Sequence, residues 1–494
     1  MHTSEAITVS LDLTSHLRSR DLTPRSMPQA ADVHADICRG ARRPHSRPRF
    51  VVPAIAAPAC ENPLVRERSR AVRIAGLCDT REPPERKSMR LIFLTVALLL
   101  LPEAVLFAQQ SESPVPPEQE TDLPDVIRAW RQKPPKPEPQ PGEKMIVAAP
   151  VIGTNPSAGF IIGAAGQMAF FQGDPSTTRI TAGIASLTIS SKKQVVLNVR
   201  FDSFSDGNRW FVEGDNRFQS TSQDVYGFGT ATPASAAVNT EFGFVRLHET
   251  ISYQVARDFY LGGGFLFDSH TDVRPADASD PNWSASPYIA YSEQNGLPTD
   301  SQQSAGFSVN ARLNRRDNDI SPRRGWMVTG QYRASFNGFL GGDSSWQELD
   351  ADARAYVPFD RYGRHRLALW TYTSIVTNGV VPYFDAPATV MDKYGRSARG
   401  YEEGRFRGEK LVYGEAEYRG PLMRNGLLGV VGFATMTTVS NSQTGEKLFD
   451  SVAPSAGGGL RLLLNKRSRT NLCFDFGWGK AGSTGVYLAI QDAF

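Results

Sequence analysis

The sequence predicts an all-β fold, a transmembrane antiparallel β-barrel. Three observations predict it. Residues 145–494 alternate apolar and polar side chains between turn signals along their whole length. The apolar positions are rich in Phe, Trp and Tyr, while the opposite face carries several charges per strand, as a lipid-facing exterior around a polar lumen requires. The strand count is even, about sixteen, and it places all the long connections on one side.

The first part of the chain does not resemble a folded domain. Residues 1–88 are rich in Arg and Pro and show neither a period of 2 nor one of 3.6. From Met89 the pattern changes, because an apolar run, Leu91–Leu101, follows a single basic residue. Residues 89–108 have the form of a secretory signal peptide and are too short for a membrane-spanning helix, although Leu106 departs from the small residue expected near the cleavage site. We interpret Met89 as the true start and 1–88 as an upstream segment translated in error; the alternative is a cytoplasmic extension ahead of a signal anchor.

The net charge and the number of cysteines limit the functions that this protein could have. The whole sequence has a formal net charge of +3, but the basic excess lies in residues 1–88, and the chain beyond the signal peptide is slightly acidic. The basic balance therefore implies no nucleic-acid partner. After residue 108 only Cys473 remains, so no internal disulfide is possible there.

A proline-rich segment, residues 109–144, separates the signal peptide from the alternating region. Such a composition favours an extended, semi-rigid tether, which we place in the periplasm. Residues 125–132 are long enough for one or two helical turns, but nothing in the segment could bury a core.

Residues 145–494 divide into sixteen expected strands. They start near residues 146, 158, 178, 193, 208, 239, 258, 303, 325, 346, 364, 409, 426, 454, 470 and 484. The connections from even to odd strands are mostly short. The connections from odd to even strands include all the long ones, at about 219–238, 271–302, 378–408 and 440–452. Short turns on one side and long loops on the other are typical of outer-membrane barrels.

The chain ends in two alternating strands, residues 473–494, joined by a Gly/Ser turn. We expect the last strand to run to Phe494 and to pair with the first strand, since a barrel in lipid leaves no open edge. A terminal aromatic after such a strand is also the address that outer-membrane assembly machinery reads. Pro150 removes a hydrogen-bond donor from the first strand, which predicts a weak seam facing the strand that carries Tyr487 and Ile490.

Three motifs resemble those of one protein family. The sequence RGYEEGRFRG at 399–408 precedes the strand LVYGEAEYRG, Arg316-Asp317 is followed by Pro322 and Gly325, and the chain closes with the strand pair described above. Together they resemble the BamA/TamA family of outer-membrane proteins, also called the bacterial surface antigen family. The resemblance covers roughly residues 145–494. It implies a long extracellular loop folded back into the barrel lumen.

The residue types of the loop motif also predict its contacts without reference to the family. Its candidate site residues are Arg399, Gly400, Tyr401, Gly404, Arg405 and Gly408. The glycines permit positive φ and close backbone packing. A guanidinium in a narrow lumen needs a carboxylate, and Glu415 and Glu417 share the charged face of the next strand. The family usually carries an acidic residue two positions after a Phe in the following strand.

Here Thr435 stands at that position, two residues after Phe433. This departure leaves Glu417 or Glu415 as the expected partner of Arg399, with Asp475 as a third candidate. The alternative is that 399–408 form a solvated surface loop.

The leading functional interpretation is a non-enzymatic barrel in the cell outer membrane that aids insertion or translocation of protein or lipid. The resemblance implies as partners outer-membrane lipid, the assembly machinery and an unidentified client. The tether is too short for a periplasmic POTRA module, so the chain resembles a short member of the family. A passive or gated pore, or a structural barrel, is the second interpretation. A barrel hydrolase is the third, but the sequence has no Gly-x-Ser-x-Gly elbow, and its scattered histidines predict neither a metal nor a cofactor.

Overall fold

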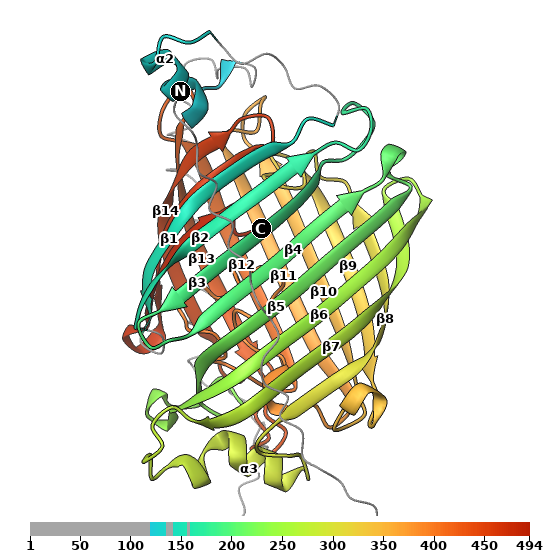
Figure 1. The fold of residues 1–494 in the computed structure, drawn as a ribbon, viewed down its shortest axis with the longest axis vertical. Helices are drawn as coiled ribbons and strands as arrows, with labels where there is room; N and C mark the ends of the chain where they lie inside the picture. Colours follow the sequence, from blue (N-terminus) through green and yellow to red (C-terminus); the bar gives the residue numbers. More distant parts are fainter. Residues whose placement is uncertain (1–118, 135–141, 156–158) are drawn as a thin grey trace, which may run out of the picture. The chain divides into compact units, whose positions relative to one another are not determined.

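The structure, a computed structural model, describes residues 119–134, 142–155 and 159–494. Sixteen strands form one antiparallel sheet in which each strand pairs with the next along the chain (Figure 1). Each strand begins within three residues of its expected start, so the predicted barrel architecture is confirmed. The expected segment 1–88, the signal peptide 89–108 and much of the tether lie outside the described residues.

The strands tilt together around the barrel (Figure 1). Their bounds are β1 Met145–Asn155, β2 Gly159–Phe170, β3 Thr181–Ser190, β4 Val195–Phe204, β5 Trp210–Val225, β6 Val238–Ala256, β7 Phe259–Pro275, β8 Gln302–Asn314, β9 Gly325–Ser335, β10 Trp346–Pro358, β11 Arg366–Gly379, β12 Lys410–Pro421, β13 Leu428–Val439, β14 Ala453–Asn465, β15 Thr470–Gly479 and β16 Thr484–Ile490. The long connections follow β5, β7, β11 and β13, as the sequence predicts.

The outer face of the sheet is apolar and the inner face is charged, as a membrane barrel requires. Val309 on β8 is 68% exposed and Phe474 on β15 is 48% exposed, whereas Asp268 on β7 and Glu417 on β12 are buried. A soluble β-sandwich would bury the apolar face instead. The apolar side chains therefore point outward, and the charged side chains point into the lumen.

Two short helices lie at opposite ends of the barrel (Figure 1). Helix α3, Pro287–Gln294, lies in the β7–β8 connection, where the Ser286 side chain caps its first turn. Tyr288 of α3 packs against Tyr383 and Phe384 from the β11–β12 connection in a buried aromatic cluster. Within the described part of the chain, no helix is long and apolar enough to cross a membrane.

Helix α2, Leu123–Trp130, lies in the tether. Asp122 and Asp125 form its capping box, and the Lys466 ammonium lies 2.7 Å from the Asp125 carboxylate. Just before the helix, Glu120 is buried and paired with Arg323. The tether is therefore not extended throughout, because its acidic residues form ion pairs with basic residues on the turns that follow β8 and β14.

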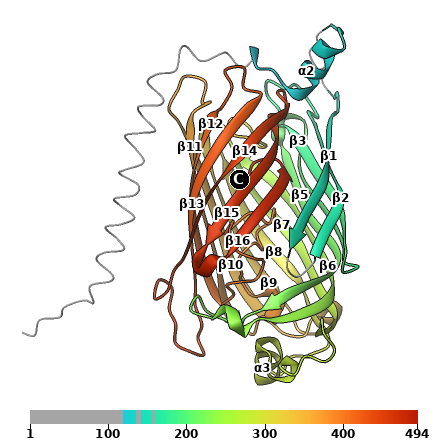
Figure 2. The same ribbon diagram turned by 90° about the vertical axis from the view of Figure 1, so that its left-hand side faces the viewer.

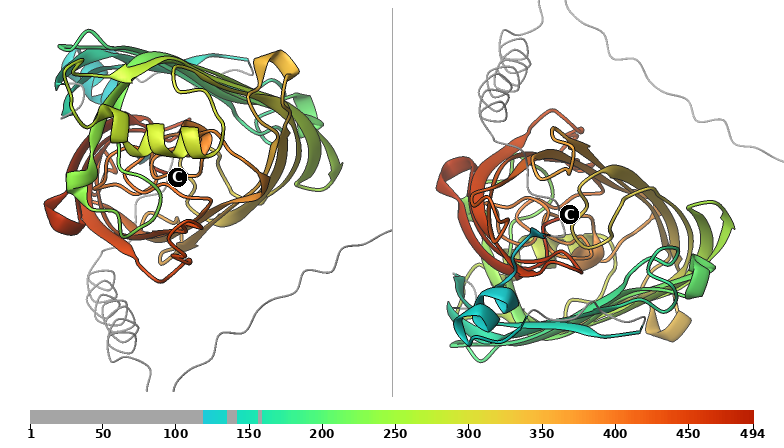
Figure 3. Two further views of the ribbon diagram at one scale, coloured as in Figure 1. Left: turned by 90° about the horizontal axis from the view of Figure 1, so that it is seen from below. Right: turned by 90° about the horizontal axis from the view of Figure 1, so that it is seen from above.

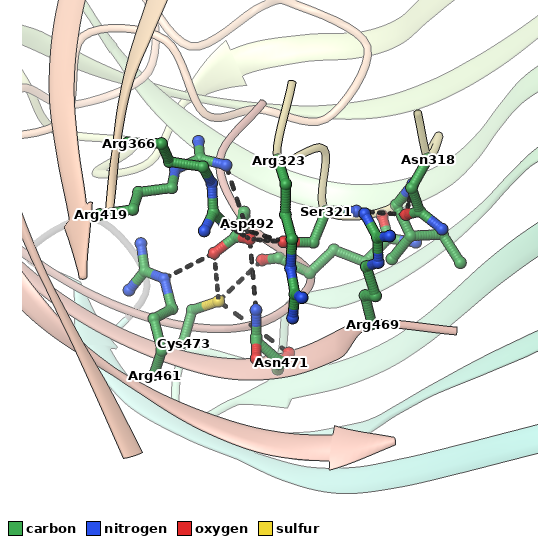
Figure 4. Close-up of polar contacts among 12 residues, drawn as sticks. Asn318, Ser321, Arg323, Arg366, Arg419, Arg461, Arg469, Asn471, Cys473 and Asp492 are labelled. Carbon is green, nitrogen blue, oxygen red and sulfur yellow. Dashed lines mark hydrogen bonds and ion pairs between the residues drawn. The ribbon is translucent and has the colours of Figure 1, made fainter. Parts of the chain in front are cut away.

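The expected end of the last strand is wrong. β16 stops at Ile490, and Gln491 adopts a left-handed conformation with φ +76°. The last residues then turn into the barrel, where the Phe494 ring packs 5.2 Å from that of Trp370 and is 4% exposed. The Asp492 carboxylate accounts for this turn, because it lies among lumenal arginines that a strand continuing outward could not reach (Figure 4).

The sheet has its two edges at β1 and β16 (Figure 2). Among the described residues no β1–β16 ladder joins them, so the expected closing ladder is not formed and the barrel is nearly closed. Pro150 lies in the middle of β1, opposite Ala164 of β2. On the lumenal side Gln167 of β2 donates a hydrogen bond to Thr470 of β15 at 3.1 Å, which ties the two sides together across the gap.

Candidate functional site

The connection between β11 and β12, residues 380–409, carries the loop motif. Gly400 has φ +107° and Gly404 has φ +74°, conformations that side-chain-bearing residues rarely adopt. At Gly400 the backbone also passes very close to β15, because a Cβ there would lie 2.9 Å from the carbonyl carbon of Trp478. Opposite it, a Cβ on Gly477 would lie 2.8 Å from the Gly400 nitrogen. Paired glycines therefore set the position of Arg399.

Arg399 makes ion pairs with three carboxylates at once. Its Nη1 donates to Asp475 Oδ2 at 2.7 Å, and its Nη2 donates to the carboxylates of Glu415 and Glu417. The structure thus brings together the arginine and all three candidate partners of the sequence. Arg399 is 1% exposed, and its guanidinium lies 3.7 Å from the centre of the Phe433 ring.

Further arginines extend this site into a network. Arg419 Nε donates to Glu417 Oε1 at 2.5 Å, and Arg461 Nη1 donates to Asp475 Oδ1 at 2.5 Å. Glu417 and Asp475 are thereby shared between Arg399 and a second cation, whereas Glu415 accepts its second hydrogen bond from the Tyr413 hydroxyl. These shared ion pairs offset the cost of removing the charges from water only while every residue of the network is present.

The charge of Arg399 is secured by these partners. Burial by itself would lower the pKa of the guanidinium, but the carboxylates of Glu415, Glu417 and Asp475 raise it well above the usual value. The guanidinium is therefore held as a cation among these carboxylates.

Two tyrosines hold the loop against the wall formed by β14–β16. The Tyr401 hydroxyl donates to the Pro454 carbonyl at 2.5 Å and accepts from the Lys480 N–H at 2.7 Å. The Tyr487 hydroxyl accepts from the Gly400 N–H at 2.8 Å. Tyr487, which the sequence assigns to the seam, therefore directs its side chain at the loop, whereas Ile490 is buried.

The other motif residues anchor the loop at its far end. Arg405 donates to the Thr232 carbonyl at 2.8 Å and stacks on the Tyr226 ring at 4.5 Å. At Gly408 a Cβ would lie 2.1 Å from the Ser440 carbonyl oxygen, so only glycine fits there. Both residues contact neighbouring long connections and have no part in the Arg399 network.

The loop also contacts the opposite side of the barrel. Lys393 Nζ lies 2.6 Å from the Asp202 carboxylate on β4 and 3.1 Å from that of Glu213 on β5. Arg407 donates to Gln223 of β5 at 3.2 Å. One connection therefore contacts β4 and β5 as well as β12 and β15, which lie far around the ring (Figure 3).

Sequence reasoning missed the supports of the loop on β13 and β14. Thr435, at the position where an acid was expected, shares a hydrogen bond with the Ser455 hydroxyl at 2.6 Å. Ser455 in turn donates to the Arg399 carbonyl at 2.6 Å. Thr435 thus supports the backbone of the loop, and Asp475 supplies a charge. The only sign of these supports in the sequence was that Thr435 and Phe433 lie on the lumenal side of the alternating pattern.

The described residues bring one serine, one histidine and one carboxylate together in the lumen. Ser304 donates to Asp385 at 2.5 Å, and His270 Nδ1 lies 3.8 Å from the same carboxylate. The serine hydroxyl is therefore hydrogen-bonded to the Asp385 carboxylate, whereas a serine–histidine pair would join it to the imidazole. Across the described ranges, no group of three or more His, Cys, Asp or Glu side chains could hold a metal ion.

Residues 267–485 match the Omp85 superfamily domain, which spans β7 to β16 and includes the Arg399 loop and its carboxylates. Residues 267–485 are thus an Omp85 superfamily domain. The outer-membrane β-barrel therefore carries an Omp85 domain, in agreement with the motif resemblance. A search of curated proteins gave no match to this chain.

Several solved structures are similar to this barrel. BamA from Haemophilus ducreyi lacking POTRA domains 1–3 has 15% identity and a TM-score of 0.44, with 70% of this chain and 69% of that chain covered. CdiB from Acinetobacter baumannii has 12% identity and a TM-score of 0.43, with 70% and 58% covered. CdiB from Escherichia coli has 11% identity and a TM-score of 0.42, with 72% and 63% covered.

Proposed function

We propose that this barrel is a non-enzymatic outer-membrane protein that inserts or translocates a protein or lipid client through its β1–β16 seam. The observation that carries the proposal is the pair of sheet edges at β1 and β16. An unpaired strand edge is costly in lipid, because no water is present to satisfy its N–H and C=O groups. The same edge is a template on which another chain can add a strand.

The two edge strands favour opening at this position. β16 has seven residues, whereas β12, β13 and β14 have twelve or thirteen, so it is too short to pair with the whole length of β1. Pro150 removes a donor from β1 itself. Because no ladder joins β1 and β16 among the described residues, the seam opens at lower cost than any paired strands of the barrel.

The lumen favours this role over a passive pore. A cavity of about 270 Å³ remains inside the barrel, and residues 385–388 and 391–394 of the β11–β12 loop and 491–494 of the tail contribute to its lining. We infer that the loop and the tail obstruct the lumen. A client would then leave sideways through the seam, and the barrel itself would conduct ions poorly.

Crosslinking the seam tests the proposal. Ala148 of β1 is exposed on the outer face, as is Val486 of β16, and a cysteine at Ala148 would be paired in turn with one at Val486 or Leu488 in a Cys473→Ser background. The purified barrel in liposomes is then assayed for folding of a small eight-stranded barrel client. We expect the crosslinked protein to lose this activity and to regain it after reduction.

The matched control is a crosslink between β8 and β9, for example at Val309 and Tyr332, which are paired and exposed. This crosslink should leave client folding unchanged. Full activity with a crosslinked seam would contradict the proposed exit route. High, steady conductance in planar bilayers would favour the pore instead.

The proposed orientation places the long connections outside the cell and the tether in the periplasm. Tags inserted near Ala285 and Gly445, both in long connections, should be accessible to antibody on intact cells. Tags near Ser205 and Arg467, both in short turns, should become accessible only after the outer membrane is permeabilised. The reverse pattern of labelling would invert the proposed topology.

A further inference from the structure

A cluster of arginines that shares Arg419 and Arg461 with the Arg399 network lies at the end of the barrel that carries the short turns. We call it the arginine chamber, a cavity of about 80 Å³. Six arginines line it: Arg323, Arg364, Arg366, Arg419, Arg461 and Arg469. They come from the connections after β8, β10 and β14 and from β11, β12 and β14, so only the folded barrel brings them together.

Two carboxylates line the same cavity, and both belong to segments outside the sheet. Glu120, just before α2, accepts two hydrogen bonds from Arg323 Nη2, at 2.8 and 2.7 Å. Asp492, on the tail after β16, lies 2.7 Å from Arg461 Nε and 3.9 Å from Arg366 Nη2 (Figure 4). Three of the six arginines also pair with carboxylates outside the cavity, Arg419 with Glu417, Arg461 with Asp475 and Arg469 with Asp317. Inside the cavity Glu120 and Asp492 are the two carboxylates, and neither of them is fixed by a strand ladder.

Several guanidinium N–H groups in the chamber have no acceptor. Arg366 Nε, Arg419 Nη1 and Arg323 Nη1 are buried and without a hydrogen-bond partner in the described part of the chain. Arg366 is 8% exposed and Arg419 is 2% exposed. A buried donor without an acceptor costs about 1–3 kcal/mol, more when it is charged, so three in one cavity are unusual for a purely structural cluster.

We propose that the arginine chamber binds a phosphate group, either of a lipid headgroup or of free inorganic phosphate. A phosphate presents more acceptor oxygens than a carboxylate, and the planar fork of Arg matches its geometry. The chamber has several times the volume that one water molecule needs. The phosphate would bind the unpartnered N–H groups and compete with Asp492 and Glu120 for their arginines.

Displacement of these acids need not disturb the barrel wall. Glu120 precedes α2 and Asp492 follows β16, so either can move without breaking a strand ladder. The Ser321 hydroxyl donates to Asp492 at 2.6 Å and could donate to a phosphate oxygen in the same place (Figure 4). The proposal is independent of client insertion and concerns a different end of the barrel from the long connections.

The test is a binding titration with the purified full barrel in phospholipid-free detergent micelles. Inorganic phosphate is titrated at pH 7.5 and constant ionic strength, with chloride as the reference, and the rise in heat-modification temperature is followed. We expect saturable stabilisation by phosphate. Arg366→Gln should weaken phosphate binding about tenfold or more, the value of one charge-assisted hydrogen bond.

A second variant keeps the test decisive if Arg366→Gln folds poorly. Asp492→Asn removes the competing charge and should tighten phosphate binding, the opposite direction. The matched control is Arg354→Gln, a lumenal arginine paired with Asp352 at 2.7 Å and absent from the chamber, which should leave the affinity unchanged. Equal effects of Arg354→Gln and Arg366→Gln, or looser binding in Asp492→Asn, would overturn the proposal.

A parallel titration with dihexanoyl phosphatidic acid distinguishes the two sources of phosphate. Tighter binding of the lipid than of inorganic phosphate assigns the chamber to a headgroup. Equal or weaker binding assigns it to the free anion. If neither ligand raises the heat-modification temperature above the chloride reference, the chamber is not a phosphate site.

Discussion

The Arg399→Ala variant should lose about 3–5 kcal/mol of barrel stability, because removing one member of a buried ionic network leaves the others uncompensated. Here the residues left behind are Glu415, Glu417 and Asp475, whose side chains are almost fully buried. Urea unfolding in micelles, or the temperature at which gel mobility changes, measures the loss. Arg399→Lys should restore only part of it, since an ammonium cannot make the same forked contacts.

A double-mutant cycle tests whether Arg399 and Glu417 stabilise each other. Glu417→Gln alone should also destabilise the barrel, and combining it with Arg399→Ala should cost less than the sum of the two single changes. Arg354→Ala, which leaves one carboxylate in the lumen, is the matched control and should cost less than Arg399→Ala. Additive effects of Arg399→Ala and Glu417→Gln would show that these two residues are energetically independent.

Gly477→Leu should displace the loop without changing a charge. A side chain there would occupy the space of the Gly400 nitrogen and of the Arg399 carbonyl carbon, 2.8 and 2.9 Å from an added Cβ. The backbone cannot shift away, because Tyr487 and Ser455 hold it on either side. We expect Arg399 to leave its carboxylates, protease sensitivity to appear between residues 390 and 408, and bilayer conductance to rise.

The matched control is Gly432→Leu on the neighbouring wall. Gly432 of β13 faces outward, and nothing lies within 4 Å of an added Cβ. This variant should keep the wild-type protease pattern and conductance. If Gly477→Leu behaves in the same way, the loop is not held against β15.

The strands were predictable because alternation and turn chemistry are local properties. Glu415 and Glu417 could be assigned to the lumen for the same reason, since residues two apart share a face of a strand. The sequence could not choose between them as the partner of Arg399, and the structure shows why. Both carboxylates, together with Asp475, converge on the same guanidinium.

The parts that were missed depend on contacts distant in sequence. Phe433 and Arg461 reach the Arg399 site only because β13 and β14 lie between β12 and β15 in the sheet. The tail was misjudged because we expected the alternating strand to end at the terminal Phe494, although two adjacent polar residues, Gln491 and Asp492, interrupt the alternation. The left-handed turn at Gln491 and the cations around Asp492 decide the direction of the tail, and the cations come from residues distant in sequence.

The inward tail has a consequence for biogenesis. Phe494 lies against Trp370 of β11, and its carbonyl accepts from Arg419 of β12 at 2.9 Å, so the tail can be seated only after those strands have formed. The aromatic ring is therefore accessible in the unfolded chain and buried in the folded barrel. If an assembly factor binds this ring, as we predict, folding would remove its binding site. An affinity tag fused after Phe494 would have to enter the lumen, so tags belong in the long connections.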